Sequence, residues 1–335
     1  MMKHANISLF VPHAGCPHQC SFCNQKTISG SVSPLTPEEV TAVLTKASLD
    51  ETEPGSTEIA FFGGSFTAIE RSYMISLLEA AYPFIENGRF CGIRISTRPD
   101  AIDEDVLAIL KKYGVTSIEL GAQSTDDGVL ALNRRGHTRE HIVNASLLIK
   151  QHGFSLGLQM MTGLPGDSFL KCVNTARDII SLRPDTVRIY PTVTLEGTML
   201  AGMYKKGEYI PQTLDEAVSL CAVLLKMFYD ENIKVIRLGL HSGGNVEEGY
   251  LAGPYHPAFG ELCESRIFLD SALAYLKENY PQQGGSFEIQ VSERSVSKMT
   301  GQRGCNKKTL AENGYNVTVR GEPELSGYGM RIIKK

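Results

Sequence analysis

Short apolar runs and amphipathic stretches alternate along most of the chain, in units of about 25–35 residues. The apolar runs predict strands at residues 7–11, 58–62, 91–97, 116–120, 155–161, 186–190 and 234–240. Apolar positions with helical spacing predict intervening helices that include residues 74–85, 103–113, 141–152, 169–182 and 213–231. This alternation is typical of parallel βαβ units. We therefore predict an α/β fold, a partial (β/α)6 barrel that stays open instead of closing with eight strands.

The pattern changes after residue 240. Residues 241–285 combine a loop rich in glycine and proline with an amphipathic helix over 261–280, which we expect to cover the barrel. Residues 286–335 predict a strand, a helix, a short G-Q-R-G loop, a second helix and a second strand. The predicted organisation is thus a barrel at 1–240, a connection at 241–285 and a small α+β appendage at 286–335.

The amino-acid composition adds little to the prediction of the fold, but it limits the class of protein that the chain can belong to. Hydrophobic residues make up 42% and charged residues 21% of the chain, which is typical of soluble globular proteins. The longest apolar runs are too short to cross a bilayer, and the N-terminus leads almost directly into a strand without room for a signal peptide. We expect a cytoplasmic protein with no membrane partner.

Charge is distributed unevenly along the chain. The formal net charge is −4, yet residues 286–335 hold nine lysines and arginines against five acidic residues. A basic tail on an acidic body suggests that the tail meets an anion such as nucleic acid. A solvated surface with no ligand would produce the same pattern.

Three cysteines lie within eight residues near the N-terminus. Cys16, Cys20 and Cys23 have the spacing C-x3-C-x2-C, and Pro17 argues against a helix there. Thiolates on one loop bind zinc or an iron–sulfur cluster. A zinc site needs a fourth ligand, for which His13 or His18 could serve, but the second C-x2-C pair of a zinc ribbon is missing. Three cysteines suit a [4Fe-4S] cluster whose fourth iron stays open.

This cysteine motif, close to the start of alternating strands and helices, resembles the radical S-adenosylmethionine (SAM) superfamily. The resemblance implies that the open iron chelates SAM and that one electron cleaves SAM to a 5′-deoxyadenosyl radical. It also implies an electron donor such as flavodoxin or ferredoxin. Cys16, Cys20 and Cys23 would then be the cluster ligands.

The predicted end of the second strand carries Gly63-Gly64-Ser65. It resembles the family's GGE-type motif, whose backbone carbonyls bind the SAM amino group, although Ser65 replaces the glutamate. A tight turn between strand and helix would also explain the two glycines. Ser96, at the end of the third strand, suits a ribose hydroxyl, or caps the next helix instead.

Two later blocks point to a branch of the superfamily. G-A-Q-S at 121–124 with N-R-R-G-H-T at 133–138 resembles a pairing in the radical SAM domain of the Elongator catalytic subunit and its relatives. By that resemblance Gln123 and Arg135 contact SAM, with Arg135 near its carboxylate. A related pattern occurs in oxygen-independent coproporphyrinogen oxidases, which carry a ribose-binding acid at the position of Gln159.

S-T-R-P-D at 96–100 and R-I-Y-P-T at 188–192 resemble two further Elongator blocks. The second predicts that Tyr190 faces the active-site cavity as a catalytic residue that orients substrate or relays a hydrogen atom. Packing at the barrel rim is the alternative role. The resemblance covers residues 5–240, and no stretch resembles the Elongator acetyltransferase domain, so we do not expect acetyl transfer to carry over.

The G-Q-R-G loop of the appendage lies between two predicted helices and two predicted strands. This order resembles a minimal KH fold, in which the GxxG backbone lies against single-stranded RNA. The candidate RNA contacts are Gly301, Gln302, Arg303, Gly304, Lys307 and Lys308. A small cap that only seals the barrel is the alternative.

These features together predict a radical SAM enzyme that modifies a nucleotide of tRNA or rRNA, and no DNA substrate. A radical SAM oxidoreductase acting on a small molecule or tetrapyrrole is a second hypothesis. A non-catalytic Fe-S protein that binds RNA is the third, and the replacement of glutamate by Ser65 favours it.

Overall fold

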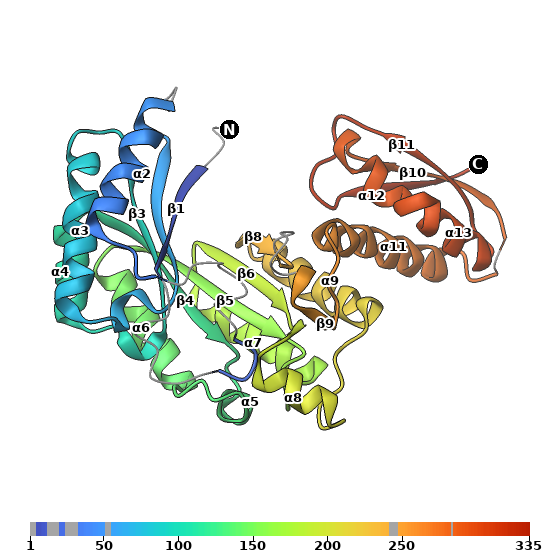
Figure 1. The fold of residues 1–335 in the computed structure, drawn as a ribbon. Coiled ribbons are helices and arrows are strands. Elements are labelled where there is room, and N and C mark those ends of the chain that lie inside the picture. Colours follow the sequence, from blue (N-terminus) through green and yellow to red (C-terminus); the bar gives the residue numbers. More distant parts are fainter. Residues whose placement is uncertain (1–4, 12–19, 24–32, 51–54, 241–246, 283) are drawn as a thin grey trace.

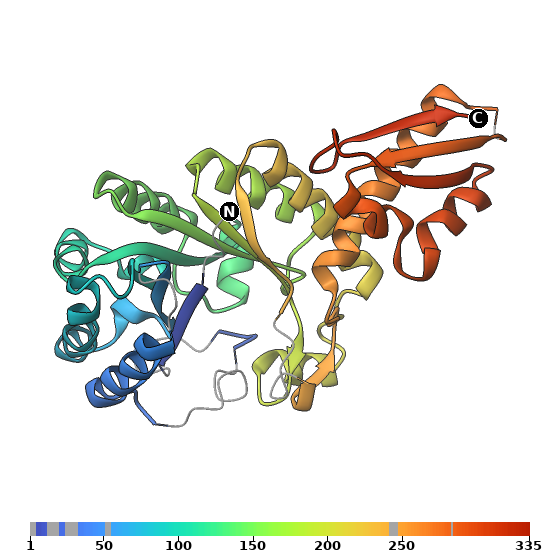
Figure 2. The same ribbon diagram turned by 90° about the horizontal axis from the view of Figure 1, so that it is seen from above.

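A computed structural model describes residues 5–11, 20–23, 33–50, 55–240, 247–282 and 284–335. Its main body is one curved parallel sheet with the strand order β1-β2-β3-β4-β5-β6-β8 (Figures 1 and 2). The strands are β1 (Ala5–Val11), β2 (Thr57–Gly63), β3 (Gly92–Thr97), β4 (Val115–Gln123), β5 (Ser155–Thr162), β6 (Thr186–Pro191) and β8 (Lys234–Leu238). Because β1 and β8 are the two edges of this sheet, the barrel is open. The predicted α/β partial barrel is confirmed.

Helices follow the strands, and most of them lie on the outer side of the sheet (Figure 2). They are α2 (Pro37–Asp50), α3 (Arg71–Glu86), α4 (Glu104–Lys112), α5 (Asp127–Leu132), α6 (Arg139–Gln151), α7 (Phe169–Leu182), α8 (Met199–Lys205) and α9 (Leu214–Asp230), with the 3-10 turns η1 (Phe66–Ala68) and η2 (Pro99–Ala101). None of the helices in the described ranges has the length and apolar character needed to cross a bilayer.

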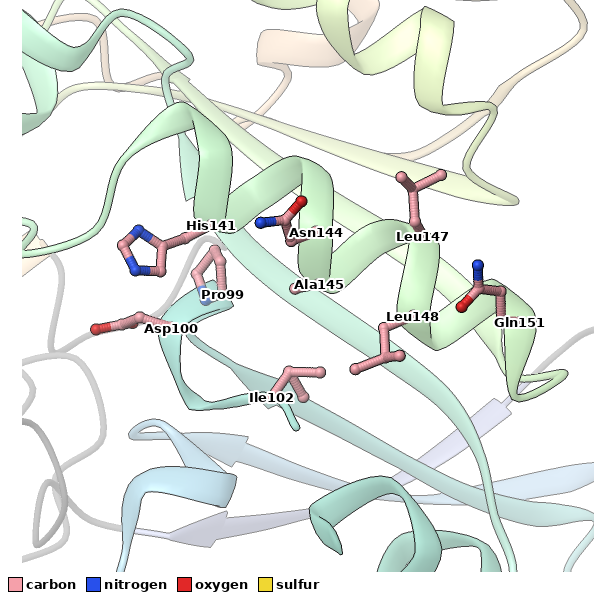
Figure 3. Close-up of a pocket in the computed structure, with 9 residues that line it drawn as sticks. All are labelled: Pro99, Asp100, Ile102, His141, Asn144, Ala145, Leu147, Leu148 and Gln151. Carbon is pink, nitrogen blue, oxygen red and sulfur yellow. The ribbon is translucent and has the colours of Figure 1, made fainter. Parts of the chain in front are cut away.

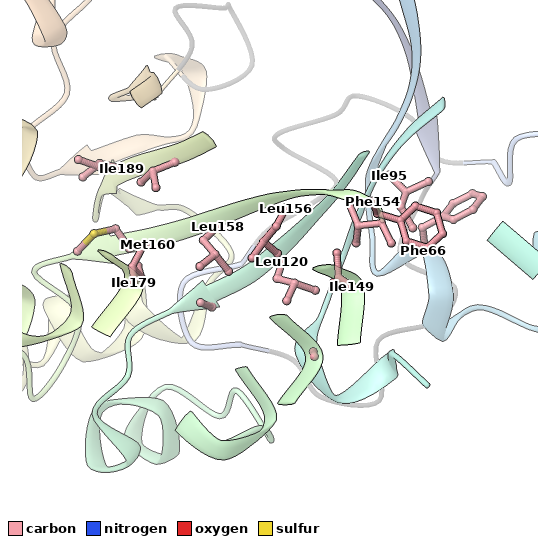
Figure 4. Close-up of a cluster of buried hydrophobic side chains, with 14 of the residues drawn as sticks. Phe66, Ile95, Leu120, Ile149, Phe154, Leu156, Leu158, Met160, Ile179 and Ile189 are labelled. Carbon is pink, nitrogen blue, oxygen red and sulfur yellow. The ribbon is translucent and has the colours of Figure 1, made fainter. Parts of the chain in front are cut away.

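The main hydrophobic core lies between the sheet and these helices. Every second strand residue points toward the helices, and Ile95, Leu120, Leu158 and Ile189 are almost fully buried there. Figure 4 shows how these side chains form one continuous layer. Consequently the other strand residues face the concave side, where the functional groups are expected.

The sequence pattern missed the shortest elements. Helices α5 and α8 have six and seven residues, and β7 (Thr194–Leu195) and β9 (Tyr250–Ala252) form a two-stranded antiparallel pair. Such elements are shorter than the window over which a helical or strand period can be recognised. Helix α5 is short, but an N-cap stabilises it: the Asp126 carboxylate accepts a hydrogen bond from the Val129 amide at 2.9 Å.

The C-terminal part forms a second, smaller sheet beside the barrel (Figure 1). Its elements are α11 (Phe259–Asn279), β10 (Ser286–Val291), η3 (Glu293–Ser295), α12 (Val296–Thr300), η4 (Gln302–Gly304), α13 (Cys305–Glu312), β11 (Asn316–Gly321) and β12 (Met330–Lys334). Strand β10 is central, parallel to β11 and antiparallel to β12. The edge strand β12 was not predicted, since three of its five side chains are exposed and its pattern is weak.

Helix α11 ties the two parts together. Its first half, with Phe259 and Ile267, belongs to the barrel core, whereas Phe268 and Leu276 belong to the core of the second sheet. The loop before β12 adds a second link, because the Tyr328 ring lies 4.7 Å from that of Tyr229 on α9. The appendage is therefore mounted on the barrel through buried side chains.

Candidate functional site

The described part of the cysteine loop is a turn over Cys20–Cys23. The Cys23 amide donates to the Cys20 carbonyl at 3.2 Å, and Cys20 is buried while Cys23 is half-buried. Cys16 lies outside the described residues, as do His13 and His18. Cys20 and Cys23 thus lie on one tight turn in the segment after β1.

Ser21 anchors this turn from two sides. Its hydroxyl donates to the Asn133 side-chain oxygen at 2.6 Å, and its amide donates to the Asn133 carbonyl at 3.2 Å. Its own carbonyl accepts from the Leu200 amide, at the start of α8, at 2.8 Å. Asn133 is fully buried and also donates to the Pro165 carbonyl at 3.0 Å. Asn133 opens the N-R-R-G-H-T block, so that block fixes the cysteine turn, a role that sequence analysis missed.

Arg135, in the N-R-R-G-H-T block, contacts both the cysteine motif and the G-A-Q-S block. It donates from Nη1 to Cys20 Sγ at 3.2 Å and from Nη2 to the Gly121 carbonyl at 2.6 Å. Arg98 in turn donates to the Arg135 carbonyl at 2.8 Å and forms a two-point ion pair with Asp100 at 2.5 and 2.8 Å. Burial alone would raise the pKa of Asp100, but the Arg98 guanidinium outweighs it and holds that pKa below its usual range. A fixed positive charge therefore lies against a sulfur whose metal-binding form is the thiolate.

Three buried polar atoms near the ends of β3 and β4 have no hydrogen-bond partner among the described residues, namely Ser96 Oγ, Gln123 Oε1 and, from the loop after α5, Arg135 Nε. Gln123 follows a bulge in β4 and has a φ of 66°. A Cβ on Gly121 would lie 3.0 Å from Gln123 Nε2 and 3.3 Å from Arg135 Nη2, so the two side chains converge above that glycine. Because unpartnered buried polar groups are costly, this arrangement suits a polar ligand. These polar atoms fit the polar groups of a cofactor such as SAM.

Gly63 and Gly64 lie where β1 and β2 pass each other most closely. Gly63 has a φ of 114°, and a Cβ there would lie 2.5 Å from the Phe10 ring and 2.6 Å from the Val11 carbonyl oxygen. The Gly64 amide donates to that same carbonyl at 2.9 Å. Glycine at position 63 is thus required by strand packing alone. Ser65 is buried and directly precedes η1.

A network of buried charges lines the concave side of the sheet. Arg94 on β3 binds the Glu58 carboxylate at 2.8 Å and the Glu119 carboxylate at 3.0 Å. Arg188 on β6 binds Glu119 from the opposite side at 2.8 Å. Burial would lower the pKa of Arg188, but the Glu119 carboxylate outweighs it and holds that pKa above its usual range.

Gln159 and Tyr190 both belong to this network. Gln159 donates to the Glu119 carboxylate at 3.1 Å, and the Tyr190 hydroxyl accepts from Arg188 at 3.4 Å. The Arg188 guanidinium also lies over the Phe62 ring, 5.4 Å from its centre. Tyr190 is half-buried and lies on the same face of β6 as Arg188.

The sequence contained a signal for this network that sequence analysis did not use. Glu58, Arg94, Glu119 and Arg188 are each the single charged residue of their strand. Strand residues alternate between faces, so a single charge in such a run marks the face turned away from the hydrophobic core. Four such charges on neighbouring strands predict a polar interior.

His137, in the N-R-R-G-H-T block, makes stability depend on pH. Burial and the Arg135 charge lower its pKa from 6.5 to about 3, and its Nε2 lies 3.1 Å from the Ala122 carbonyl oxygen. The unfolded chain binds more protons between these two pKa values, so stability is present above pH 6.5 and is lost as pH falls toward 3. We expect the free energy of unfolding to fall by about 1 kcal/mol per pH unit through this group. Urea titrations from about pH 6 to pH 4 would show a shallower fall for His137→Gln, whereas equal slopes would contradict the assignment.

One hollow among the described residues lies outside the barrel. It has a volume of about 380 Å³ between η2 and α6, and Figure 3 shows its lining. The lining consists of Pro99, Asp100, Ile102, His141, Asn144, Ala145, Leu147, Leu148 and Gln151. It contains none of the site residues predicted from the sequence.

The predicted GxxG residues form a tight turn between α12 and α13. Gly301, Arg303 and Gly304 all have positive φ, at 77°, 53° and 74°. The side chains of Gln302, Arg303, Lys307 and Lys308 are exposed. The three cations among them, Arg303, Lys307 and Lys308, therefore lie at the turn and the start of α13, on the opposite end of the molecule from α4 (Figure 1).

Comparison with known proteins identifies the barrel. The sequence profile of the radical SAM superfamily matches residues 10–179, just over half of the chain, and that of the Radical_SAM C-terminal domain matches residues 184–268. A tRNA uridine(34) acetyltransferase of Methanocaldococcus jannaschii is 30% identical in an alignment 258 positions long, which covers 64% of this chain and 47% of that protein. Elongator complex protein 3 of Homo sapiens is 32% identical over 139 residues, 41% of this chain and 25% of that protein. The chain spans about half the length, or less, of these relatives.

Solved structures show the same fold. The archaeal Elp3 of Methanocaldococcus infernus, with an N-terminal deletion, matches with a TM-score of 0.60 at 22% identity, over 82% of this chain and 63% of that one. Coproporphyrinogen III oxidase from Escherichia coli matches with a TM-score of 0.51 at 18% identity, over 68% of this chain and 52% of that one. At these identities the matches establish the architecture alone.

Proposed function

Since the chain belongs to the radical SAM superfamily, we propose that it cleaves SAM reductively at a [4Fe-4S] cluster and modifies an RNA nucleotide, in tRNA or rRNA. The observation that supports the first part most strongly is the contact between Arg135 and Cys20 Sγ, beside three buried polar atoms without partners. The second part rests on the appendage and on the RNA-modifying names of the relatives.

Different site residues hold the cluster and SAM. Cys16, Cys20 and Cys23 supply the thiolates, and Ser21 and Asn133 hold the described turn in place. When bound, the cluster and SAM supply one-electron cleavage of the sulfonium, which yields a 5′-deoxyadenosyl radical. Ser96, Gln123 and Arg135 present their unpartnered polar atoms to SAM, and Gly63, Gly64 and Ser65 shape its other side.

The network of buried charges fills the concave side of the sheet beneath the proposed SAM position. Glu119 is 1% exposed and binds Arg94, Arg188 and Gln159 together. The Arg188 guanidinium donates to the Tyr190 oxygen, which leaves the Tyr190 hydroxyl proton free to point toward the cavity. We assign Tyr190 the role of orienting the substrate beside the radical.

The appendage supplies the proposed RNA contact. Its order β10–α12–turn–α13–β11 is that of a minimal KH module, with the two helices on one face of the sheet. Asn306 is buried and donates to the Ser265 carbonyl of α11 at 3.0 Å, so the helix after the turn is fixed to the barrel-bound helix. A Cβ on Gly301 would lie 2.6 Å from Cys305 Sγ, which explains the first glycine of the turn. The exposed Arg303, Lys307 and Lys308 provide positive charge for phosphates.

Charge reversal at the turn tests the RNA proposal. We expect Lys307→Glu/Lys308→Glu to weaken binding of total cellular RNA and to reduce the salt slope by about 0.7 for each lost phosphate contact. The reason is that both lysines are exposed beside the turn and pair with no described acidic residue. The measurements are RNA affinity at several salt concentrations and 5′-deoxyadenosine formation with and without RNA.

Lys111→Glu/Lys112→Glu on α4 is the matched control, since these lysines are also exposed and carry the same charge. We expect the control to bind RNA like the wild type. If RNA neither stimulates nor inhibits SAM cleavage, the RNA proposal would be overturned in favour of a small-molecule substrate. RNA binding without any SAM cleavage would instead indicate a non-catalytic RNA-binding protein.

A further inference from the structure

Four large apolar side chains surround the loop that follows β5. We call Leu132, Phe169, Leu170 and Ile210 the rim patch; their exposed fractions are 59%, 56%, 63% and 86%. They come from the end of α5, the first turn of α7 and the segment between α8 and α9. An exposed group of this kind usually marks a protein–protein contact.

The rim patch is continuous around residues 163–168. A Cβ on Gly166 would lie 2.4 Å from Leu132 Cδ1, so Leu132 rests on the loop. Ile210 and the loop residues Gly166 and Ser168 line one hollow of about 200 Å³, and Phe169 follows Ser168 directly. The opposite side of α7, including Cys172 and Ala176, is buried in the barrel core, so Phe169 and Leu170 have no role in packing it.

The patch is connected by hydrogen bonds to the cysteine turn. Asn133, next to Leu132, binds the Pro165 carbonyl of the loop on one side and Ser21 on the other. Ser21 directly follows Cys20. One buried side chain therefore separates this exposed surface from the proposed cluster ligands.

We propose that the rim patch is the docking surface for a small one-electron carrier protein that reduces the cluster. This inference rests on the proposed function, in which each SAM cleavage consumes one electron that must come from outside the chain. The carrier loses that electron, the cluster gains it, and no atom passes between the two proteins. An apolar patch that lies one residue from the cluster turn brings the carrier's redox centre close to its target.

The charges around the patch favour an acidic carrier. Arg134, directly after Asn133, and Lys206, at the end of α8, are exposed cations that form no ion pair with any described residue. The exposed Glu208 is the opposing charge between Lys206 and Ile210. Cations at the rim speed the encounter with an acidic partner, while the apolar centre holds it.

The test compares two reductants on the reconstituted full chain. We expect Phe169→Glu/Ile210→Glu to lower the second-order rate constant for cluster reduction by reduced flavodoxin about tenfold or more, because both substitutions place charge in the apolar contact. Reduction by dithionite, which needs no docking surface, should be unchanged. Glutamate in the first turn of α7 is compatible with the helix, so the variant should fold.

Leu49→Glu on α2 is the control, because Leu49 is 81% exposed on a helix far from α5 and α8 (Figure 1). Stopped-flow absorbance gives the rate constants, and reduced ferredoxin is tested in parallel. Unchanged rate constants with both carriers in the double variant would overturn the docking proposal, as would a wild type that dithionite reduces but neither carrier does. Failure of dithionite itself to support SAM cleavage would instead overturn the proposed function.

Discussion

Replacing Arg135 with leucine is expected to lower dithionite-driven 5′-deoxyadenosine formation by on the order of a hundredfold, a magnitude typical for loss of a residue that orients metal ligands. Arg135 binds Cys20 Sγ and the Gly121 carbonyl with two different nitrogens, and its third nitrogen is buried with no partner among the described residues. Leucine removes both hydrogen bonds, the buried donor and the positive charge at the sulfur. Lysine should retain part of the activity at best, since a single ammonium cannot reproduce the planar fork.

Arg134→Asn is the matched control for this prediction. Arg134 is the exposed neighbour of Arg135 and has a φ of 54°, a conformation that asparagine tolerates. We expect it to cleave SAM at the wild-type rate with dithionite. Iron content should be measured for both variants, because it separates a lost cluster from a lost SAM contact. Wild-type activity in Arg135→Leu would refute the assignment of this residue.

Replacing Glu119 with leucine is expected to lower the free energy of unfolding by about 3–5 kcal/mol, the usual cost of removing one partner from a buried ion pair. Glu119 is 1% exposed, and its carboxylate is the shared partner of Arg94 and Arg188. Without it Arg188 keeps no carboxylate partner among the described residues, whereas Arg94 keeps Glu58. Chemical denaturation of the purified chain measures the effect.

Two further variants make this prediction specific. Glu119→Leu/Arg188→Met should recover part of the lost stability, because the charge that was left unpaired is removed as well. Glu196→Gln breaks the exposed Glu196–Lys205 pair and should change stability little, because solvent screens an exposed ion pair. A loss from Glu119→Leu no larger than that of Glu196→Gln would show that the network does not stabilise the barrel.

The strands of the barrel were predictable because their periodicity is strong and local. Their predicted ends agree with the structure to within a few residues, for example 186–190 against Thr186–Pro191 for β6. Helices α5 and α8 were not predictable, since their short sequences contain less than two full helical turns of pattern. These two helices are the ones that hold Ser21, so the missed elements include those that position the cysteine turn.

The site was predictable as a set of blocks but not as a set of contacts. The sequence places Gln123 and Arg135 in neighbouring motifs, yet their meeting above Gly121 depends on a bulge in β4 and on the buried Asn133. The buried Glu119 network links side chains from five strands, β2 to β6, and only the fold brings its members together. Tertiary hydrogen bonds of this kind produce no periodic pattern in the amino-acid sequence.

The central claim is that this chain uses three cysteines to hold the cluster at which SAM is cleaved. The most direct measurement is 5′-deoxyadenosine formed per chain after anaerobic reconstitution, with SAM and dithionite, alongside the iron content. We predict a [4Fe-4S] cluster and 5′-deoxyadenosine for the wild type, and neither for Cys16→Ala/Cys20→Ala/Cys23→Ala. Full iron in the triple variant, or a complete wild-type cluster that yields no 5′-deoxyadenosine, would contradict the claim.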